Sequence, residues 1–444
     1  MDAIRPSTYG GANRDIIRPL WRPSLGYALF WLAAMLLAVY GGWCWYMQIK
    51  WGMGMDGIHS PNFWGVYIIT FVFWIGIGHA GTLISAILFL VRSRWRTGVY
   101  RASEAMTVFA VMTAGLFPML HLGRVWQVYW FFPYPNQRQL WVNFKSPLMW
   151  DVFAISTYFT ISAVFFYVGL IPDIAIVRDH SSGLKRRFYG LLSLGWRGTG
   201  RQWHHFMAAY GFFAAICAPL VLSVHSVVSW DFAMANSAGW HSTLFPPYFV
   251  AGAIYSGCGM VITLLLPLTL LFKWEEYLNR WHFENLAKMC ILTGGILTYA
   301  YAIEIFVAWY SQNPYEQHVF FWRMDGPYAW IFWTMVFCNC VVPISFWSKK
   351  LRTNYGWLFF TSILINIGMW MERANFVLSS QSHDFDPVTW GLYFPQPTEF
   401  GILAGSVGWF FFWFLAFCMA FPAIAITEIK ESTAPPVKGH LEVA

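Results

Sequence analysis

The sequence predicts an all-α integral membrane protein with ten transmembrane helices. Of its 444 residues, 58% are hydrophobic and only 11% are charged, whereas soluble domains carry about 25% charged residues. Apolar runs that reach the roughly 20 residues needed to cross a bilayer recur along the whole chain. The connections between these runs are too short to form a separate soluble domain. The expected spans cover residues 25–48, 61–91, 103–131, 147–177, 205–231, 246–272, 283–310, 327–348, 355–379 and 400–427.

The distribution of basic residues supports an even number of crossings. Alternate loops hold 22 of the 28 Lys and Arg residues, the opposite loops hold four, and helices hold two. Cytoplasmic loops are enriched in Lys and Arg, so we expect both termini in the cytoplasm and attribute the net charge of +7 to topology, not to nucleic-acid binding. The 22 are Arg5, Arg14, Arg18, Arg22, Arg92, Arg94, Arg96, Arg101, the six from Arg178 to Arg201, Lys273, Arg280, Lys288, Lys349, Lys350, Arg352, Lys430 and Lys438. The other six are Lys50, Arg138, Lys145 and Arg323 in the opposite loops, and Arg124 and Arg373 in helices.

A weak internal repeat predicts how the spans are grouped. A shift of 180 residues aligns VMTAGLF (111–117) with ILTGGIL (291–297) and SPLMWD (146–151) with GPYAWI (326–331). The shift equals four spans and preserves membrane orientation, as parallel repeats require; chance similarity is the alternative. We expect two four-helix bundles, spans two to five and six to nine, with the first and last spans outside.

This grouping divides the chain into five segments, and the two bundles differ at polar positions. The repeat sets His121 on Tyr301, Arg124 on Glu304 and Asp151 on Ile331, so only the first bundle keeps the His and Asp. The segments are a cytoplasmic stretch (1–24), a peripheral helix with an outer loop (25–60), the first bundle (61–235), the second bundle (236–380), and an outer loop, last helix and cytoplasmic tail (381–444).

The cysteine and histidine patterns predict no redox cofactor bound by this chain. The seven cysteines are scattered, and neither Cys-x-x-Cys, Cys-x-x-Cys-His nor a P-loop occurs. A bis-histidine haem needs histidines that face each other, and His79, His121 and His225 are expected at different depths. We expect neither haem nor an iron–sulfur cluster here.

Ionisable residues inside the spans predict a functional site. Such residues are costly in a bilayer and by default mark function. At about 1.5 Å per residue, His121 is expected about 15 Å below the outer surface and Asp151 within about 8 Å of it. His79 is expected near the middle. The others expected in the outer half are His225, Asp231, Glu304, Glu372 and Arg373, so polar groups from five spans converge on one side.

Several of these residues also have a structural interpretation. His121 is compatible with a hydrogen bond to a neighbouring carbonyl. Asp151 could act as a dipole partner of the helix that Ser146 and Pro147 begin, although it lies slightly too deep to cap it. Arg124 and Glu304 fit an ion pair between the bundles.

The remaining residues have comparable alternatives. Arg373 fits a local ion pair or a side chain that reaches the interface, and Asp231 fits a solvated carboxylate. His225 fits a hydrogen-bonded core histidine. His79, which has glycines at positions 78 and 81 beside it, fits a close helix contact.

His, Asp and Arg in an apolar, aromatic environment suit a small ligand with two polar ends and an apolar tail, such as a quinol. Histidine titrates near neutral pH, a nearby carboxylate accepts and passes on a proton, and arginine orients the far oxygen. Without a redox centre in this chain, the electrons must leave to another subunit on the outer face.

Three segments resemble the NrfD/PsrC-like quinol-interacting membrane subunits, and within that family the ActC-type subunits of bacterial alternative complex III. They are GHAGTLISAILFLVRSRWR (78–96), FPMLHLGRVWQVYW (117–130) and SPLMWDVFAISTYF (146–159). The resemblance covers essentially the whole chain. It implies oxidation of menaquinol or ubiquinol at the periplasmic side of the bacterial inner membrane.

The same resemblance implies roles for individual residues. His121 and Asp151 are implied to be catalytic, and both would bind the quinol together with Arg373 and Asp231. Residues implied on a proton path are His79, Tyr158, Glu304 and Arg124.

The resemblance also implies partners. They are an iron–sulfur subunit on the periplasmic face, c-type haem subunits, a homologous membrane subunit, and cytochrome c or another downstream acceptor, all among membrane lipids. Two other functions stay open from the residues alone. One is a proton or solute transporter with a helix broken near Gly76, Gly78 and Gly81, and the other is a membrane anchor without a ligand.

Overall fold

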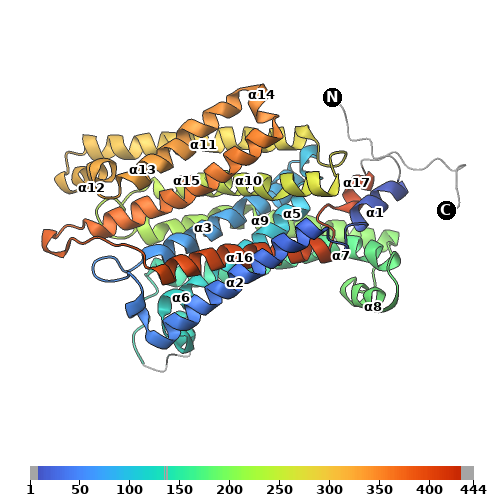
Figure 1. Ribbon diagram of the computed structural model, residues 1–444, viewed down its shortest axis with the longest axis horizontal. Coiled ribbons are helices and arrows are strands. Elements are labelled where there is room, and N and C mark those ends of the chain that lie inside the picture. The colour runs from blue at the N-terminus through green and yellow to red at the C-terminus, as the bar shows by residue number, and fades with distance from the viewer. Residues whose placement is uncertain (1–8, 135, 137–138, 432–444) are drawn as a thin grey trace, which may run out of the picture.

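The computed structural model describes residues 9–134, 136 and 139–431. This part of the chain is all-helical and contains no β-strand, which confirms the all-α class. Figure 1 shows the long helices running side by side, with α1 (Tyr9–Ile17) and α17 (Ile426–Glu431) at the same end. Arg5, Arg138 and Lys438, used above for topology, lie outside the described residues, as do the outermost parts of the two terminal segments.

Nine helices of the described chain are long and apolar enough to cross a membrane, so this is a multi-pass membrane protein. Six are single helices: α2 (Leu25–Trp51), α7 (Pro147–Asp179), α9 (Gly200–Ala233), α10 (Phe245–Phe272), α11 (Arg280–Tyr310) and α16 (Pro397–Ala420). Three are composite: α3 (Gly65–Thr82) with η2 (Leu83–Ile87) and α4 (Leu88–Leu90); α5 (Tyr100–Ala114) with α6 (Phe117–Leu122); and α13 (Ala329–Val336) with η5 (Phe337–Val341) and η6 (Val342–Trp347).

The ninth expected span, 355–379, corresponds to α15 (Tyr355–Ser382), which does not qualify among these nine. The helix has 28 residues, so its polar composition and not its length sets it apart. It packs against α3, α10 and α13, with Glu372 and Arg373 fully buried. The count of ten spans therefore stays a prediction.

The third expected span, 103–131, is shorter than predicted. α6 ends at Leu122, where Gly123 adopts φ +70°, a conformation open to glycine without steric cost. The chain then continues as the 3-10 segment η4 (Val125–Phe131). His121 therefore lies in the last turn of its helix, and its expected depth of about 15 Å stays a prediction.

Polar caps and prolines determine where the long helices begin. Thr199 and Gln202 form a capping box before α9, and Asn279 caps α11, which satisfies backbone N–H groups that have no partner within the helix. Pro147 and Pro397 occupy the first turns of α7 and α16, where a missing N–H costs nothing.

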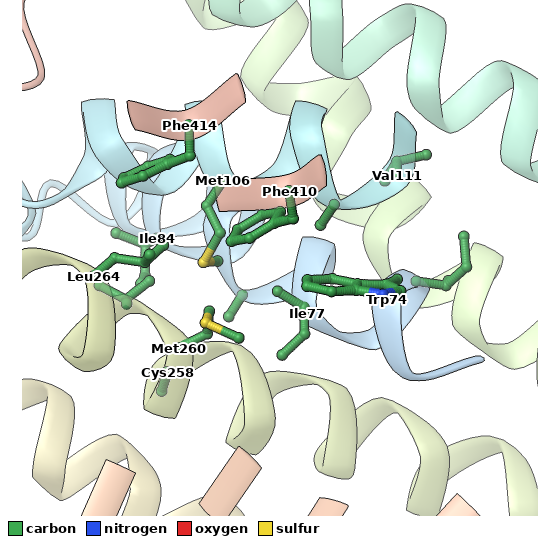
Figure 2. Packing of buried hydrophobic residues seen from close by; sticks show 14 of the residues in the cluster. Trp74, Ile77, Ile84, Met106, Val111, Cys258, Met260, Leu264, Phe410 and Phe414 are labelled. Atoms are coloured by element: carbon green, nitrogen blue, oxygen red, sulfur yellow. The ribbon is translucent and has the colours of Figure 1, made fainter. Parts of the chain in front are cut away.

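The centre of the molecule is the contact between α3 and α10. In the most apolar stretches of these helices, 89% and 83% of residues are buried. Close approach depends on small residues, since a side chain at Gly257 would collide with Ala80. Figure 2 shows the surrounding apolar core, with side chains from α3, α5, α10 and α16 that include Trp74, Ile77, Met106, Met260, Leu264, Phe410 and Phe414.

The remaining long helices surround this pair. α5 and α9 contact both α3 and α7, α11 and α15 contact α10, and α13 contacts α15. α2 and α16 pack on each other outside, where Gly41 and Gly405 bring the two backbones into contact. These contacts agree with the two bundles and two peripheral helices inferred from the repeat, which stays an interpretation.

Short elements complete the fold. α8 (Gly183–Leu192) lies at the end of the molecule that holds α1 and α17, and α12 (Pro314–Asp325) lies at the opposite end (Figure 1). The others are η1 (Met53–Met55), η3 (Arg94–Arg96), α14 (Lys349–Arg352) and η7 (Pro387–Thr389).

Candidate functional site

Two carboxyl groups from different helices meet near one end of the helices. Asp151 lies one turn inside α7, and Asp231 lies two residues before the end of α9. Their neighbours Trp150 and Trp230 pack edge to face with ring centroids 5.6 Å apart, and the two carboxyls interact directly. Asp151 is buried, and Oδ1 of each carboxyl has no hydrogen-bond partner. Because like charges in contact repel, this pair is suited to share one proton.

His121 and Arg124 lie at the end of α6. His121 is half-buried, and its Nδ1 is buried without a hydrogen-bond partner. Arg124 is exposed because the helix ends before it. Within the described residues, no hydrogen bond or ring contact joins His121 to Asp151, so their joint action stays a prediction.

The expected ion pair between Arg124 and Glu304 is not formed. Glu304 instead feels the charge of Arg323, which belongs to α12 in the predicted second bundle, without a direct ion pair between them. Arg323 is buried and donates hydrogen bonds to the hydroxyls of Ser379 and Ser380, at 2.7 and 3.1 Å. Glu304 and Arg323 both belong to the predicted second bundle, so this interaction does not link the two bundles.

A buried aromatic layer lies deeper, where His79 of α3 stacks on Tyr158 of α7 with ring centroids 5.1 Å apart. The Nδ1 of His79 is 2.6 Å from the Ile75 carbonyl, and its Nε2 has no partner. The Tyr158 hydroxyl donates to the Gly78 carbonyl at 3.0 Å and lies 2.8 Å from the Thr82 hydroxyl. The structure therefore joins two residues of the expected proton path.

His225 of α9 completes this layer. Its ring centroid lies 4.5 Å from that of His79, so the expectation of different depths for these two histidines is wrong. Neither ring nitrogen of His225 has a hydrogen-bond partner, so it is not the satisfied core histidine that was the alternative. The depth criterion used against a bis-histidine haem does not apply to this pair, and the absence of haem stays a prediction.

Arg373 of α15 approaches the layer from the second half of the chain. Its guanidinium lies over the Phe249 ring at 5.4 Å, and His225 packs on the same ring at 5.7 Å. Arg373 forms an ion pair with Glu372, which also accepts a hydrogen bond from Tyr301. Charged and titratable groups from both predicted bundles therefore lie together around the Phe249 ring and the two histidines.

A cavity of about 810 Å³ opens beside α11 and reaches Glu304. Glu304 and Phe320 also line a second void of about 20 Å³, which extends to Tyr301. The smaller void has the volume of roughly one water molecule. Glu304 therefore shares the lining of this void with Tyr301, the hydrogen-bond partner of Glu372. The cavity is lined by Asn236, Gly239, His241, Ser242, Thr243, Leu244, Pro247, Ile303, Glu304, Val307, Ala308, Ser311, Asn313, Glu316, Phe320 and Phe385.

Sequence reasoning missed a buried ionic cluster near the end of the molecule that holds α1 and α17, where the Thr427 backbone N–H donates to Asp173. Arg101 donates to Glu104 at 3.1 Å and to Asp173 at 3.2 Å, and the Tyr210 hydroxyl donates to Glu104 at 3.1 Å. All four residues are buried. A signal existed, because Glu104 and Asp173 stand inside expected spans, where carboxylates are rare.

Comparison with known proteins identifies relatives over most of the chain. The family model described as "Polysulphide reductase, NrfD" matches residues 56–383. A Halobacterium salinarum protein described as a membrane subunit of a dimethyl sulfoxide reductase is 24% identical over 79% of this chain and 76% of its own length.

Two further relatives are also named as parts of oxidoreductases. A selenate reductase subunit from Mesobacillus selenatarsenatis is 22% identical over 69% of this chain and 71% of its own length. An integral membrane subunit of an Hdr-like menaquinol oxidoreductase from Archaeoglobus fulgidus is 22% identical over 74% and 73%.

Proposed function

Because the chain belongs to the NrfD family of polysulphide reductase membrane subunits, we propose that it binds and oxidises quinol within a respiratory or photosynthetic electron-transfer complex of the alternative complex III type. Relatives named as subunits of oxidoreductases, two of them as membrane subunits, support a role at the level of the complex. The observation that carries the proposal is the pair of carboxyls, Asp151 and Asp231, that α7 and α9 bring together beside two tryptophans.

Quinol oxidation releases two protons and two electrons, and the carboxyl pair supplies a proton acceptor. We propose that Asp151, with Asp231, takes the proton of one quinol hydroxyl and that His121 takes the proton of the other, while both electrons leave to the partner iron–sulfur subunit. Arg373 would orient the far oxygen from the deeper layer.

Proton translocation is the second part of the proposal. The stacked layer of His79, Tyr158 and His225 lies two turns from Asp151, since Tyr158 follows Asp151 by seven residues on the same helix face. Glu304 would extend the path through its one-water void. Arg124, which is exposed at the end of α6, would lie where the proposed proton path opens at the outer surface.

We place the chain in the bacterial inner membrane with ten crossings, α15 being the ninth, and with both termini in the cytoplasm. Electrons from menaquinol or ubiquinol would pass to an iron–sulfur subunit on the periplasmic face and on through c-type haem subunits to cytochrome c or another acceptor. A homologous membrane subunit would complete the assembly. Menaquinol in the name of the Archaeoglobus fulgidus relative supports a quinone substrate.

Asp151→Asn in the intact complex tests the proposal. The substitution removes the proton acceptor but preserves side-chain volume, so we expect quinol:acceptor turnover to fall by about 10² or more while the complex stays assembled; His121→Ala should act likewise. Asp179→Asn is the matched control, because this residue lies on the same helix but is exposed and paired with Arg178. Normal turnover of Asp151→Asn would contradict the site assignment.

A further inference from the structure

α8 carries a stripe of large apolar side chains that the rest of the protein leaves uncovered. Leu184, Phe188 and Leu191 are 81%, 46% and 76% exposed. They are spaced four and three residues apart, so they share one face of the helix. α8 has ten residues and is not among the nine spans of the described chain. The stripe is therefore not the lipid-facing side of a transmembrane helix.

Hydrogen bonds from its inner side hold α8 in a defined orientation. The buried Tyr189 hydroxyl donates to the Ala420 carbonyl at 2.6 Å and accepts from the Trp21 indole at 2.6 Å. The Tyr167 hydroxyl donates to the Leu192 carbonyl at 2.7 Å. The outward direction of the apolar stripe is therefore set by the fold.

Basic side chains flank the stripe on both sides. At about 100° per residue, Lys185 lies on one side of the Leu184 direction and Arg187 on the other, whereas Arg186 lies opposite. No Asp or Glu occurs between residues 180 and 230. This arrangement is typical of a helix that lies in the plane of a membrane surface, with apolar residues inserted and cations at the edges.

The surroundings of α8 have the composition of a membrane–water interface. α8 lies beside the end of α7, on the side of the molecule that holds α1 and α17 (Figure 1). Trp196 and Trp203 pack edge to face nearby in the chain at 5.1 Å, and the Lys185 ammonium lies 5.2 Å from the Trp21 ring. Tryptophans gather at the level of lipid headgroups.

We propose that α8 is an interfacial helix that binds acidic phospholipids. Leu184, Phe188 and Leu191 insert among the acyl chains, and Lys185 and Arg187 contact headgroup phosphates. A stripe of two helical turns is too small for a stable protein interface, which buries about 1,000 Å² or more. The inference requires only that the chain spans a membrane, so it stands or fails independently of quinol oxidation.

Spin labels in the intact complex, reconstituted in nanodiscs, test the insertion. Leu191→Cys and, as the matched control, Arg186→Cys place a label on opposite sides of α8; the native cysteines are buried or half-buried. We expect the label at 191 to be relaxed by oxygen and protected from a water-soluble nickel complex, and the label at 186 to show the reverse. A label at 191 that is open to nickel, or shielded from both reagents by another protein, would overturn insertion.

Native mass spectrometry with phosphatidylglycerol and phosphatidylcholine tests the headgroup preference. The complex should retain phosphatidylglycerol selectively, and Lys185→Gln with Arg187→Gln should weaken that retention by about fivefold for each charge removed. Arg186→Gln should change it less. Equal retention of both lipids by the unmodified complex would refute the acidic-lipid part of the proposal, even with the helix inserted.

Discussion

His79 and His225 face each other from α3 and α9 with ring centroids 4.5 Å apart, and three of their four ring nitrogens lack a hydrogen-bond partner. Two imidazoles in contact cannot both carry a charge cheaply in a buried apolar site. The pair can therefore hold at most one extra proton at a time, as a single step of a proton relay requires.

His225→Phe separates a relay role from a packing role. No hydrogen bond is lost at His225, so a phenyl ring should leave the melting temperature of the complex nearly unchanged. If His225 relays protons, quinol-driven proton release should fall by about 10². His282→Phe provides the contrast, since His282 is buried but bonded to Asn279 at 3.0 Å: it should lower the melting temperature and leave turnover normal. Full proton release by His225→Phe would exclude the relay.

Arg101→Met should destabilise the protein strongly. The substitution leaves Glu104 and Asp173 buried without their shared cation, and breaking a buried ionic cluster in this way costs about 3–5 kcal/mol. The yield of folded complex and its melting temperature measure the effect. Adding Glu104→Gln and Asp173→Asn should restore most of the loss, because the uncompensated charges are then absent. Failure of this triple variant to recover would show that the cluster contributes through its hydrogen bonds and not through charge.

Gly41→Val should disrupt the pairing of α2 with α16, whereas Gly42→Val should not. A side chain at Gly41 would overlap the backbone of Gly405, and nothing lies within 4 Å of a Cβ at Gly42. Overpacking typically costs about 1–3 kcal/mol, so Gly41→Val should lower the melting temperature in detergent. Equal effects of the two neighbours would mean that helix propensity matters more than the contact.

Stability should depend on pH through Asp56, which lies outside the spans. Burial raises the pKa of Asp56 from 3.8 to about 6, against the lowering effect of the hydrogen bond from Tyr67. The folded state thus holds this proton more firmly than the unfolded state, so the contribution to stability is full below pH 3.8 and is lost as pH rises through about 6. Asp56→Asn keeps the acceptor for Tyr67 but cannot ionise. Relative to the native protein, its melting temperature should rise as pH increases from 3.8 to about 6 and then stay constant, measured beside the exposed control Asp386→Asn.

Sequence patterns predict the fold class and most of the spans because bilayer thickness dictates the length of an apolar run. The predicted helix ends are wrong where the backbone conformation, and not the hydrophobicity of the residues, determines where a helix stops. Apolar residues continue to Phe131, but Gly123 turns the chain out of the helix after Leu122. His121 therefore lies in the last turn of α6 and not in the middle of a longer helix.

Side-chain partners were harder to predict than helix positions. The Arg124–Glu304 pair rested on a repeat register, whereas α12, a helix outside the expected spans, supplies Arg323 instead. The contact of His225 with His79 requires the relative rotation and axial offset of α3 and α9, which no single-helix pattern contains. The sequence predicts that polar residues of several spans converge on one side, but it does not predict which of them are in contact.

The polarity of α15 has a consequence for how the protein is made. A helix that carries Glu372 and Arg373 enters lipid poorly by itself, since a charged residue near mid-helix opposes insertion by about 3 kcal/mol. In the proposed ten-span topology, α3 and α10, against which α15 packs, are synthesised earlier and would provide the surface that receives it. Insertion of α15 would then depend on the contact between α3 and α10 having formed first. A substitution that weakens this contact should therefore impair a late stage of membrane insertion.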